Sequence, residues 1–130
     1  MKKKPRRSKR SKLKIIKKKA WKAFSEFIRK RDRNCFTCNA RPFSWKELQA
    51  GHFIHGKLDF DEMNINAQCI RCNHFLSGNL ASYTINLIRK HGMEKVEELR
   101  QRASLAIVEK YPYEYFEEIQ KKYETLNVNA

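Results

Sequence analysis

Apolar side chains recur at helical spacing early in the chain, between Ala20 and Arg31. Four large apolar residues occupy positions i, i+3, i+6 and i+7 of this stretch, which is the spacing of one face of an α-helix. We therefore predict an amphipathic helix whose apolar stripe packs against the centre of the protein and whose opposite face is basic. The stripe consists of Trp21, Phe24, Phe27 and Ile28.

The same helical periodicity returns in three stretches of the C-terminal half. Gly92 separates the first two, because glycine readily ends a helix, and Pro112 stands where the third begins. The third has an aromatic-rich face, which we expect to pack in the core or to mediate self-association, with ligand stacking as the weaker alternative. The three predicted helices span about 80–90, 93–105 and 113–126. The aromatic-rich face contains Tyr111, Tyr113, Tyr115, Phe116, Ile119 and Tyr123.

The middle of the chain has short strand-like pieces separated by turns. Residues 45–54 contain such pieces, and Gly51 marks a bend or bulge among them. A loop built around Gly56 follows, and 64–76 contains a turn and the start of a helix that Ser77-Gly78-Asn79 interrupts. We predict an α+β protein, mostly helical, with a small central unit and flanking helices.

Charge divides the chain into three parts. The formal net charge is +15, and residues 1–19 hold 12 of the 29 Lys and Arg with no acidic residue. Such a block repels itself, so we predict a disordered basic arm at 1–19, a weakly basic core at 20–91 and a slightly acidic helical extension at 92–130. The arm is expected to bind nucleic-acid phosphates, with a solubility tail or a membrane-surface patch as alternatives. The expected contacts are Lys2, Lys3, Lys4, Arg6, Arg7, Lys9, Arg10, Lys12, Lys17, Lys18 and Lys19.

Four cysteines form two C-x-x-C pairs, and these predict a structural zinc site. Each pair can offer two thiolates to one tetrahedral ion. Disulfides or a redox role are the alternative, but disulfides need an oxidising compartment. No secretory apolar region follows the basic arm, and no apolar run is long enough to span a membrane. The four expected ligands of one zinc per chain are Cys35, Cys38, Cys69 and Cys72.

His52 and Asn73 are the two side chains with chemistry suited to phosphodiester hydrolysis. A histidine at a strand end can take a proton from water, and an amide oxygen at a helix start can hold a hard cation that neutralises phosphate charge. Asn73 directly follows Cys72, so the zinc would fix its position. A buried structural histidine is the competing interpretation of His52.

These motifs together resemble the NinG (Rap) family of phage recombination nucleases, over about residues 30–105. Within the broader HNH, or ββα-metal (His-Me finger), superfamily, the resemblance implies a zinc-stapled ββα-metal core. It implies His52 as the general base, Asn64 as the residue that braces the loop, and Asn73 as the ligand of a catalytic Mg²⁺ or Mn²⁺. The stretches that carry the resemblance are Cys35-Phe-Thr-Cys38, Ala50-Gly51-His52-Phe53, Phe60-Asp61-Glu62-Met63-Asn64-Ile65, Gln68-Cys69-Ile-Arg-Cys72-Asn73, Ser77-Gly78-Asn79-Leu80 and Val96-Glu97-Glu98-Leu99.

One position departs from the broader superfamily. Most of its members have an aspartate before the histidine as a further metal ligand, whereas this chain, like the NinG pattern, has Gly51. A nearby carboxylate or water would have to take its place, and a carboxylate near Asn64 could instead be structural. The carboxylates considered are Asp59, Asp61 and Glu62, and His55 and His74 are secondary candidates. His91 is expected only to favour a helix C-terminus.

The leading hypothesis is a metal-dependent endonuclease acting on branched recombination intermediates, such as Holliday junctions and D-loops. The resemblance implies a phage or prophage protein in the cytoplasm of a bacterial host, with DNA as its partner and phage or host recombination proteins as further partners. Resolution of a junction by paired nicks would favour a homodimer. The alternatives are a non-catalytic zinc module that binds nucleic acid and a protein-interaction adaptor that uses the tyrosine-rich C-terminal helix.

Overall fold

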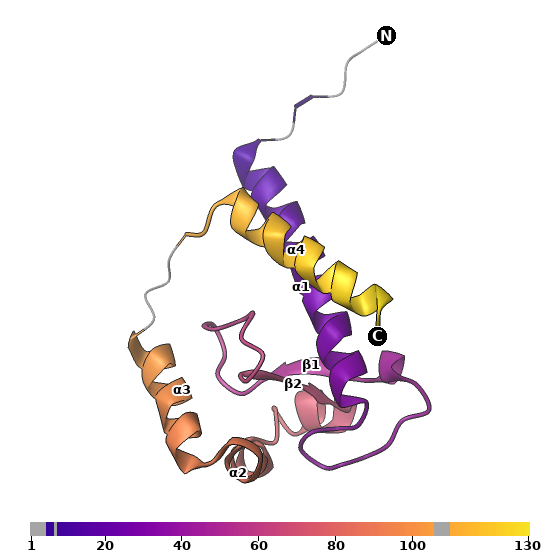
Figure 1. The fold of residues 1–130 in the computed structure, drawn as a ribbon, viewed down its shortest axis with the longest axis vertical. Coiled ribbons are helices and arrows are strands. Elements are labelled where there is room, and N and C mark those ends of the chain that lie inside the picture. The colour runs from indigo at the N-terminus through magenta and orange to yellow at the C-terminus, as the bar shows by residue number, and fades with distance from the viewer. Residues whose placement is uncertain (1–4, 7, 106–109) are drawn as a thin grey trace.

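The computed structural model describes residues 5–6, 8–105 and 110–130, and in this part of the chain it is mostly helical with one small sheet (Figure 1). None of the described helices combines the length and the apolar character needed to cross a membrane. The elements in chain order are α1 (Lys9–Asp32), η1 (Trp45–Glu47), β1 (Gln49–His52), β2 (Ile65–Gln68), the π-helical turn η2 (Arg71–Phe75), α2 (Leu80–His91), α3 (Met93–Leu105) and α4 (Tyr113–Val128).

Helix α1 begins at Lys9, so the expected boundary of a disordered arm at Lys19 is wrong. Ser8 caps the helix by accepting a hydrogen bond from the backbone N–H of Ser11 at 3.1 Å. Lysine and arginine are good helix formers, and neither proline nor glycine interrupts 9–32. A short apolar run in this stretch supplies the rest, because Leu13 and Ile16 pack beneath α4.

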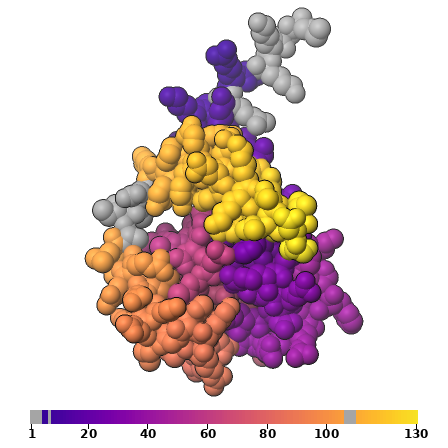
Figure 2. All heavy atoms as spheres, viewed as in Figure 1, coloured from indigo at the N-terminus to yellow at the C-terminus, as the bar shows by residue number. Residues whose placement is uncertain are grey.

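Helix α4 returns along α1, so two segments about a hundred residues apart lie side by side (Figures 1 and 2). Phe116 and Tyr123 of α4 are buried, and Tyr123 packs edge-on against Phe24 with ring centres 4.8 Å apart. Next to this pair, the side-chain amide of Asn127 donates to the carbonyl of Ala23 at 3.0 Å. The aromatic-rich face therefore splits between the core and the surface, since Tyr111 and Tyr113 remain exposed.

Strands β1 and β2 form an antiparallel hairpin in which His52 pairs with Ile65 and Gly51 pairs with Asn66. Successive residues of a strand point to opposite faces. Ile65 and Ala67 on one face join the buried cluster that contains Phe24 and Ile28 of α1, as the predicted apolar stripe requires. The opposite face carries Asn66 and Gln68, both fully buried.

Helices α2 and α3 cover this second face and confirm two predicted helices. The helix expected at about 80–90 is Leu80–His91, and the helix expected at 93–105 has those bounds. Gly92 ends α2 at φ 90°, a conformation that favours glycine. Tyr83 and Leu87 of α2 pack with Val96 of α3, which closes the far side of the hairpin.

Candidate metal centre and active site

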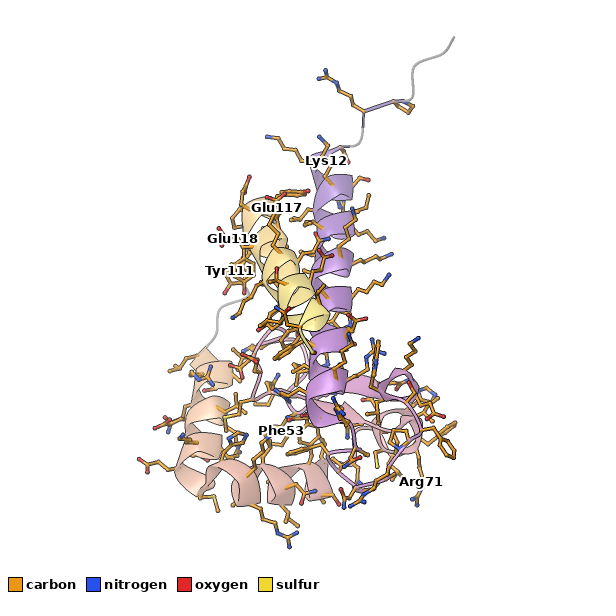
Figure 3. The ribbon with its side chains drawn as sticks, turned by 45° about the vertical axis from the view of Figure 1, so that its right-hand side comes forward. Lys12, Phe53, Arg71, Tyr111, Glu117 and Glu118 are labelled. Carbon is orange, nitrogen blue, oxygen red and sulfur yellow. The ribbon has the colours of Figure 1, made fainter. Side chains whose placement is uncertain are left out.

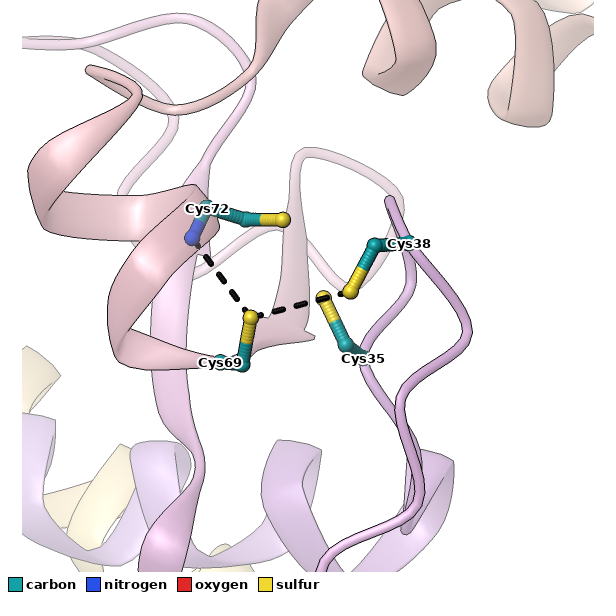
Figure 4. Close-up of side chains that lie close together, drawn as sticks. All are labelled: Cys35, Cys38, Cys69 and Cys72. Atoms are coloured by element: carbon teal, nitrogen blue, oxygen red, sulfur yellow. Dashed lines mark hydrogen bonds between the residues drawn. The ribbon is translucent and has the colours of Figure 1, made fainter.

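The four cysteines come together into one cluster, with all four sulfur atoms within 4.8 Å of one another (Figure 4). Tetrahedral zinc–thiolate bonds of about 2.3 Å place neighbouring sulfurs about 3.8 Å apart. The Sγ atoms of Cys38 and Cys69 are 3.7 Å apart, which fits that geometry. The expectation that both C-x-x-C pairs form one cluster is confirmed, and the cluster could hold a metal such as zinc.

Hydrogen-bond donors surround these sulfurs as they do in metal-bound thiolates. The backbone N–H of Cys72 points to Cys69 Sγ at 3.5 Å, and the side-chain amide of Asn79 donates to Cys72 Sγ at 3.6 Å. Burial works to raise the pKa of Cys35, but hydrogen bonds from Thr37 and from backbone N–H groups outweigh it and lower that pKa to about 6. Desolvation and the neighbouring thiols raise the pKa of Cys38 to about 12. Cys35 thus ionises readily, whereas ionisation of Cys38 is unfavourable. A divalent cation would stabilise the thiolate form of all four cysteines.

His52 ends strand β1 on the face that α1 covers. Its Nε2 lies 3.2 Å from Oδ1 of Asp59, and its ring stacks on Trp21 with centres 5.1 Å apart. The ring of His55 stacks at 5.2 Å. The His52 side chain is 22% exposed, so it is held on several sides while still reaching solvent. This is not the environment of a histidine sealed in a core.

Asp59 anchors this imidazole from the loop that follows β1. The hydrogen bond from His52 lowers the pKa of the Asp59 carboxyl against the opposing effect of partial burial, and the charges of His52 and His55 lower it further. Asp59 therefore stays ionised as an acceptor over a wider acid range than an ordinary aspartate. Of the three carboxylates considered from the sequence, this is the one that contacts His52.

A groove of about 690 Å³ opens beside His52, and we call it the His52 groove. It lies between α1, the loop after β1 and the start of α4. Its lining consists of Lys17, Lys18, Trp21, His52, residues 56–61, Tyr111, Tyr115 and Phe116.

Asn64 is fully buried and ties the loop to the hairpin. Its side-chain oxygen accepts from the backbone N–H of Ile54 at 2.9 Å, and its amide donates to the carbonyl of Ile54 at 3.0 Å. The same amide lies 3.2 Å from the carbonyl of Leu58. These contacts fix the path of the chain between His52 and Asp59. Asn64 therefore holds this loop through hydrogen bonds to its backbone.

Asn73 lies on η2, against the other face of β1. Its Nδ2 donates to Oε1 of Gln49 at 2.8 Å, and its Oδ1 faces Gly51, 3.0 Å from the point that a Cβ there would occupy. Oε1 of Gln68 lies 1.8 Å from the same point, so the two oxygens are within 4.8 Å of each other. The Gln68 oxygen is buried without a hydrogen-bond partner among the described residues. The structure thus brings together two amide oxygens at the Gly51 position.

His52 and Asn73 flank the same strand from opposite sides, and their contacts do not overlap. His52 contacts α1 and the loop, whereas Asn73 contacts Gln49 and the Gly51 position. The sequence did not reveal Tyr83, whose hydroxyl lies 2.7 Å from the carbonyl of Gly51 and receives a hydrogen bond from Asn66. Burial raises the pKa of Tyr83, which keeps the hydroxyl protonated as a donor. Its position in α2 follows the apolar periodicity, so no sequence signal separates it from a core residue.

The remaining candidates have other roles or lie apart. Asp61 accepts hydrogen bonds from the backbone N–H groups of Met63 and Asn64 and pairs with Arg102 at 2.8 Å, which is a structural role. Glu62 and His74 are exposed. His91 lies in the last turn of α2, where burial and nearby basic residues lower its pKa.

Most of the basic residues expected to contact nucleic acid lie along the exposed surface of α1. Lys12 lies near the start of the helix, and basic side chains project along its free side (Figure 3). Lys17 and Lys18 line the His52 groove. Arg6, Lys9, Arg10, Lys12 and Lys19 are also exposed, while Lys2, Lys3, Lys4 and Arg7 lie outside the described residues.

Comparison with known proteins gives one consistent result. The family described as "Bacteriophage Lambda NinG protein" matches residues 1–129. The chain is 40% identical over 88 residues to Protein ninG of Escherichia phage 933W, covering 63% of this chain and 43% of the relative. It is 39% identical over 88 residues to Protein ninG of Escherichia phage lambda and of Salmonella phage P22, covering 63% of this chain and 42% of each. The match thus spans less than half the length of these relatives, and no solved structure matches the chain.

Proposed function

Because the chain belongs to the NinG family of phage proteins, we propose that it is a metal-dependent endonuclease that cuts branched DNA during phage recombination. The observation that carries the proposal is the setting of His52. Its imidazole ends a strand, is oriented by Asp59, and opens into a groove bordered by lysines. Branched DNA as the substrate rests on the family resemblance.

The order of the elements supports an HNH, or ββα-metal, core. Two antiparallel strands are followed by a helical turn, and Asn64 braces the loop between the strands. The cysteine cluster ties the segment after α1 to the end of β2 and the start of η2. A structural zinc there would hold the hairpin and the helical turn in one rigid unit.

His52 would act as the general base. With Asp59 as the acceptor of the Nε2 proton, the neutral imidazole leaves Nδ1 free to take a proton from water. The water oxygen would attack phosphorus as that proton moves to Nδ1, while the bond from phosphorus to the leaving sugar oxygen breaks and that oxygen takes a proton from solvent. Trp21 and His55 both stack on the ring and hold its plane, so that Nδ1 keeps one direction during the transfer.

The side-chain oxygen of Asn73 fits a weakly held Mg²⁺ or Mn²⁺. Asn73 Oδ1 is a neutral hard ligand on a half-buried turn, and a cation that keeps several waters and uses substrate phosphates needs few protein ligands. A bound ion would neutralise phosphate charge and stabilise the leaving oxygen. Asn73 and His52 lie on different faces of β1, so this assignment does not follow from the role of His52.

A cleavage assay on a four-way junction and a matched linear duplex, with Mg²⁺ or Mn²⁺, tests the function. We expect the junction to be cut in preference to the duplex, and His52→Ala to stop cleavage while zinc content and DNA affinity persist. His74→Ala is the matched control, because His74 is exposed on η2 and outside the groove. Cleavage by His52→Ala at the wild-type rate would refute the proposal.

A second function is a zinc module that binds nucleic acid without cutting it. Gly51 favours it, because this position supplies no carboxylate to a catalytic ion. Under this function, the protein would bind junctions yet leave them intact with every divalent cation tested.

A further inference from the structure

The His52 groove combines two kinds of side chain that nucleic-acid sites use together. Lys17 and Lys18 contribute positive charge from α1, and Tyr111 and Tyr115 contribute aromatic surface from the start of α4. The groove also contains Asp59 and Asp61, but Asp59 is paired with His52 and Asp61 with Arg102. Its charge is therefore suited to an anionic ligand.

Tyr111 and Tyr115 form a stacked pair whose outer member is open to solvent. Their rings lie 4.1 Å apart and within 16° of parallel. Tyr111 lies just ahead of α4 (Figure 3) and remains 42% exposed. Phe116 and Tyr123 already fill the contact between α4 and α1, so Tyr111 adds little to the core. An exposed aromatic stack next to lysines is the arrangement on which unpaired bases stack.

The groove has room for a nucleotide, and stacking on Tyr111 requires that its base be unpaired. A volume of 690 Å³ is within the range of roughly 300–1,000 Å³ for sites that hold a ligand as large as a nucleotide. A paired base has its faces covered by its neighbours and cannot stack on Tyr111. Unpaired bases occur at branch points and not within an intact duplex.

We propose that the His52 groove binds an unpaired DNA segment, with Tyr111 stacking on a base and Lys17 and Lys18 contacting its phosphates. The inference rests on the proposed nuclease function for its position next to His52, and it gives that function a structural basis for preferring branched DNA. Tyr111, Tyr115 and Phe116 form one wall of the groove, so the site depends on α4, which lies outside the cysteine cluster.

Binding without divalent metal tests the inference independently of cleavage. Fluorescence anisotropy would compare a short oligothymidylate with a duplex of equal length, using wild type, Tyr111→Ala and Tyr111→Phe. Loss of one base stack corresponds to about a 5- to 150-fold weaker affinity for the single strand. We expect that loss for Tyr111→Ala only, because phenylalanine keeps the stacking ring, and duplex binding should be unchanged.

Tyr113→Ala is the matched control, because Tyr113 is 40% exposed and lies outside the groove. It should leave both affinities within about twofold, since it removes no stacking contact. Equal losses for Tyr111→Ala and Tyr113→Ala, or an unchanged single-strand affinity for Tyr111→Ala, would overturn the inference. Polyglutamate tests an acidic peptide as the alternative ligand. The inference would also be overturned if polyglutamate binding required Tyr111 and oligothymidylate binding did not. If no DNA is cut but Tyr111→Ala selectively loses the single strand, the nuclease proposal fails and the groove assignment stands.

Discussion

The two faces of strand β1 differ in their exposure to solvent. On the face toward α1, His52 lies at an open groove with its partner Asp59 half exposed. On the other face, Asn66, Gln68 and Tyr83 are fully buried; Asn66 donates a hydrogen bond to Tyr83, and Gln68 donates one to the carbonyl of Gly78. Consecutive residues, Gly51 and His52, thus face a packed interior and a solvent-accessible site. We call the side with Asn66, Gln68 and Tyr83 the network face and the side with His52 the groove face. We expect substitutions on the network face to change the stability of the protein, and those on the groove face to change its catalytic activity.

Removing the metal should have the largest effect. Structural zinc in small domains contributes about 10–16 kcal/mol of apparent binding free energy, so Cys72→Ser or a strong chelator should unfold the network face. Metal analysis of protein purified without added zinc should find about one equivalent per chain. Thermal unfolding followed by circular dichroism measures the loss. A metal-free protein with an unchanged transition would contradict the zinc assignment.

His52→Ala should have the next largest effect, confined to the groove face. Loss of a general base costs about two to four powers of ten in rate. The side chain is already partly solvated, so the unfolding temperature should change little. Single-turnover cleavage measures the rate, and thermal unfolding of the same variant provides the comparison. Unfolding by this substitution would place His52 among the structural residues.

Gly51→Ala should destabilise the protein, and its added methyl group should lie outside the His52 groove. A Cβ there would lie 1.8 Å from Gln68 Oε1, and Gln68 cannot withdraw freely because its amide donates to the carbonyl of Gly78 at 2.8 Å. Overpacking of this kind costs about 1–3 kcal/mol. Urea unfolding of Gly51→Ala, Gln68→Ala and the double variant measures the coupling. We expect the double variant to lose less free energy of unfolding than the two single variants lose together. Additive losses would refute the steric link between Gly51 and Gln68.

Neutralising α1 should give the smallest effect. Deleting 2–19 would also remove Leu13 and Ile16, which pack under α4, so charge substitutions on the helix surface are the cleaner test. Lys14→Gln with Lys18→Gln should reduce the log–log salt slope of duplex binding by about 0.9 per lost phosphate contact. Lys121→Gln with Lys122→Gln on α4 is the control, which should leave the slope unchanged. An equal reduction in both pairs would show that α1 has no special role in binding.

The sequence predicts local features well where a residue type imposes its own geometry. Gly92 and Ser77-Gly78-Asn79 delimit α2, and the spacing of the C-x-x-C pairs predicts the cysteine cluster. It fails at the start of α1, because the stability of Lys9–Lys19 comes from packing on a helix about a hundred residues away.

The surroundings of the site could not be predicted for the same reason. The stack of Trp21 on His52 and the hydrogen bond from Tyr83 to Gly51 join residues that are about thirty positions apart. Each of these aromatics lies at an ordinary apolar position of its helix, so only the fold distinguishes it. The proximity of Asn73 and Gln68 to the Gly51 position likewise depends on the register of the hairpin.

The return of α4 along α1 also sets an order of assembly during synthesis. The contact between Ala23 and Asn127 spans 104 residues, so at about 5–20 residues per second α1 waits roughly 5–20 s on the ribosome for its partner. The cysteines, between 35 and 72, are all available well before that. The cysteine cluster can therefore form first, while the groove is complete only when α4 docks. A chain released between these two events would have a formed cysteine cluster and an incomplete groove.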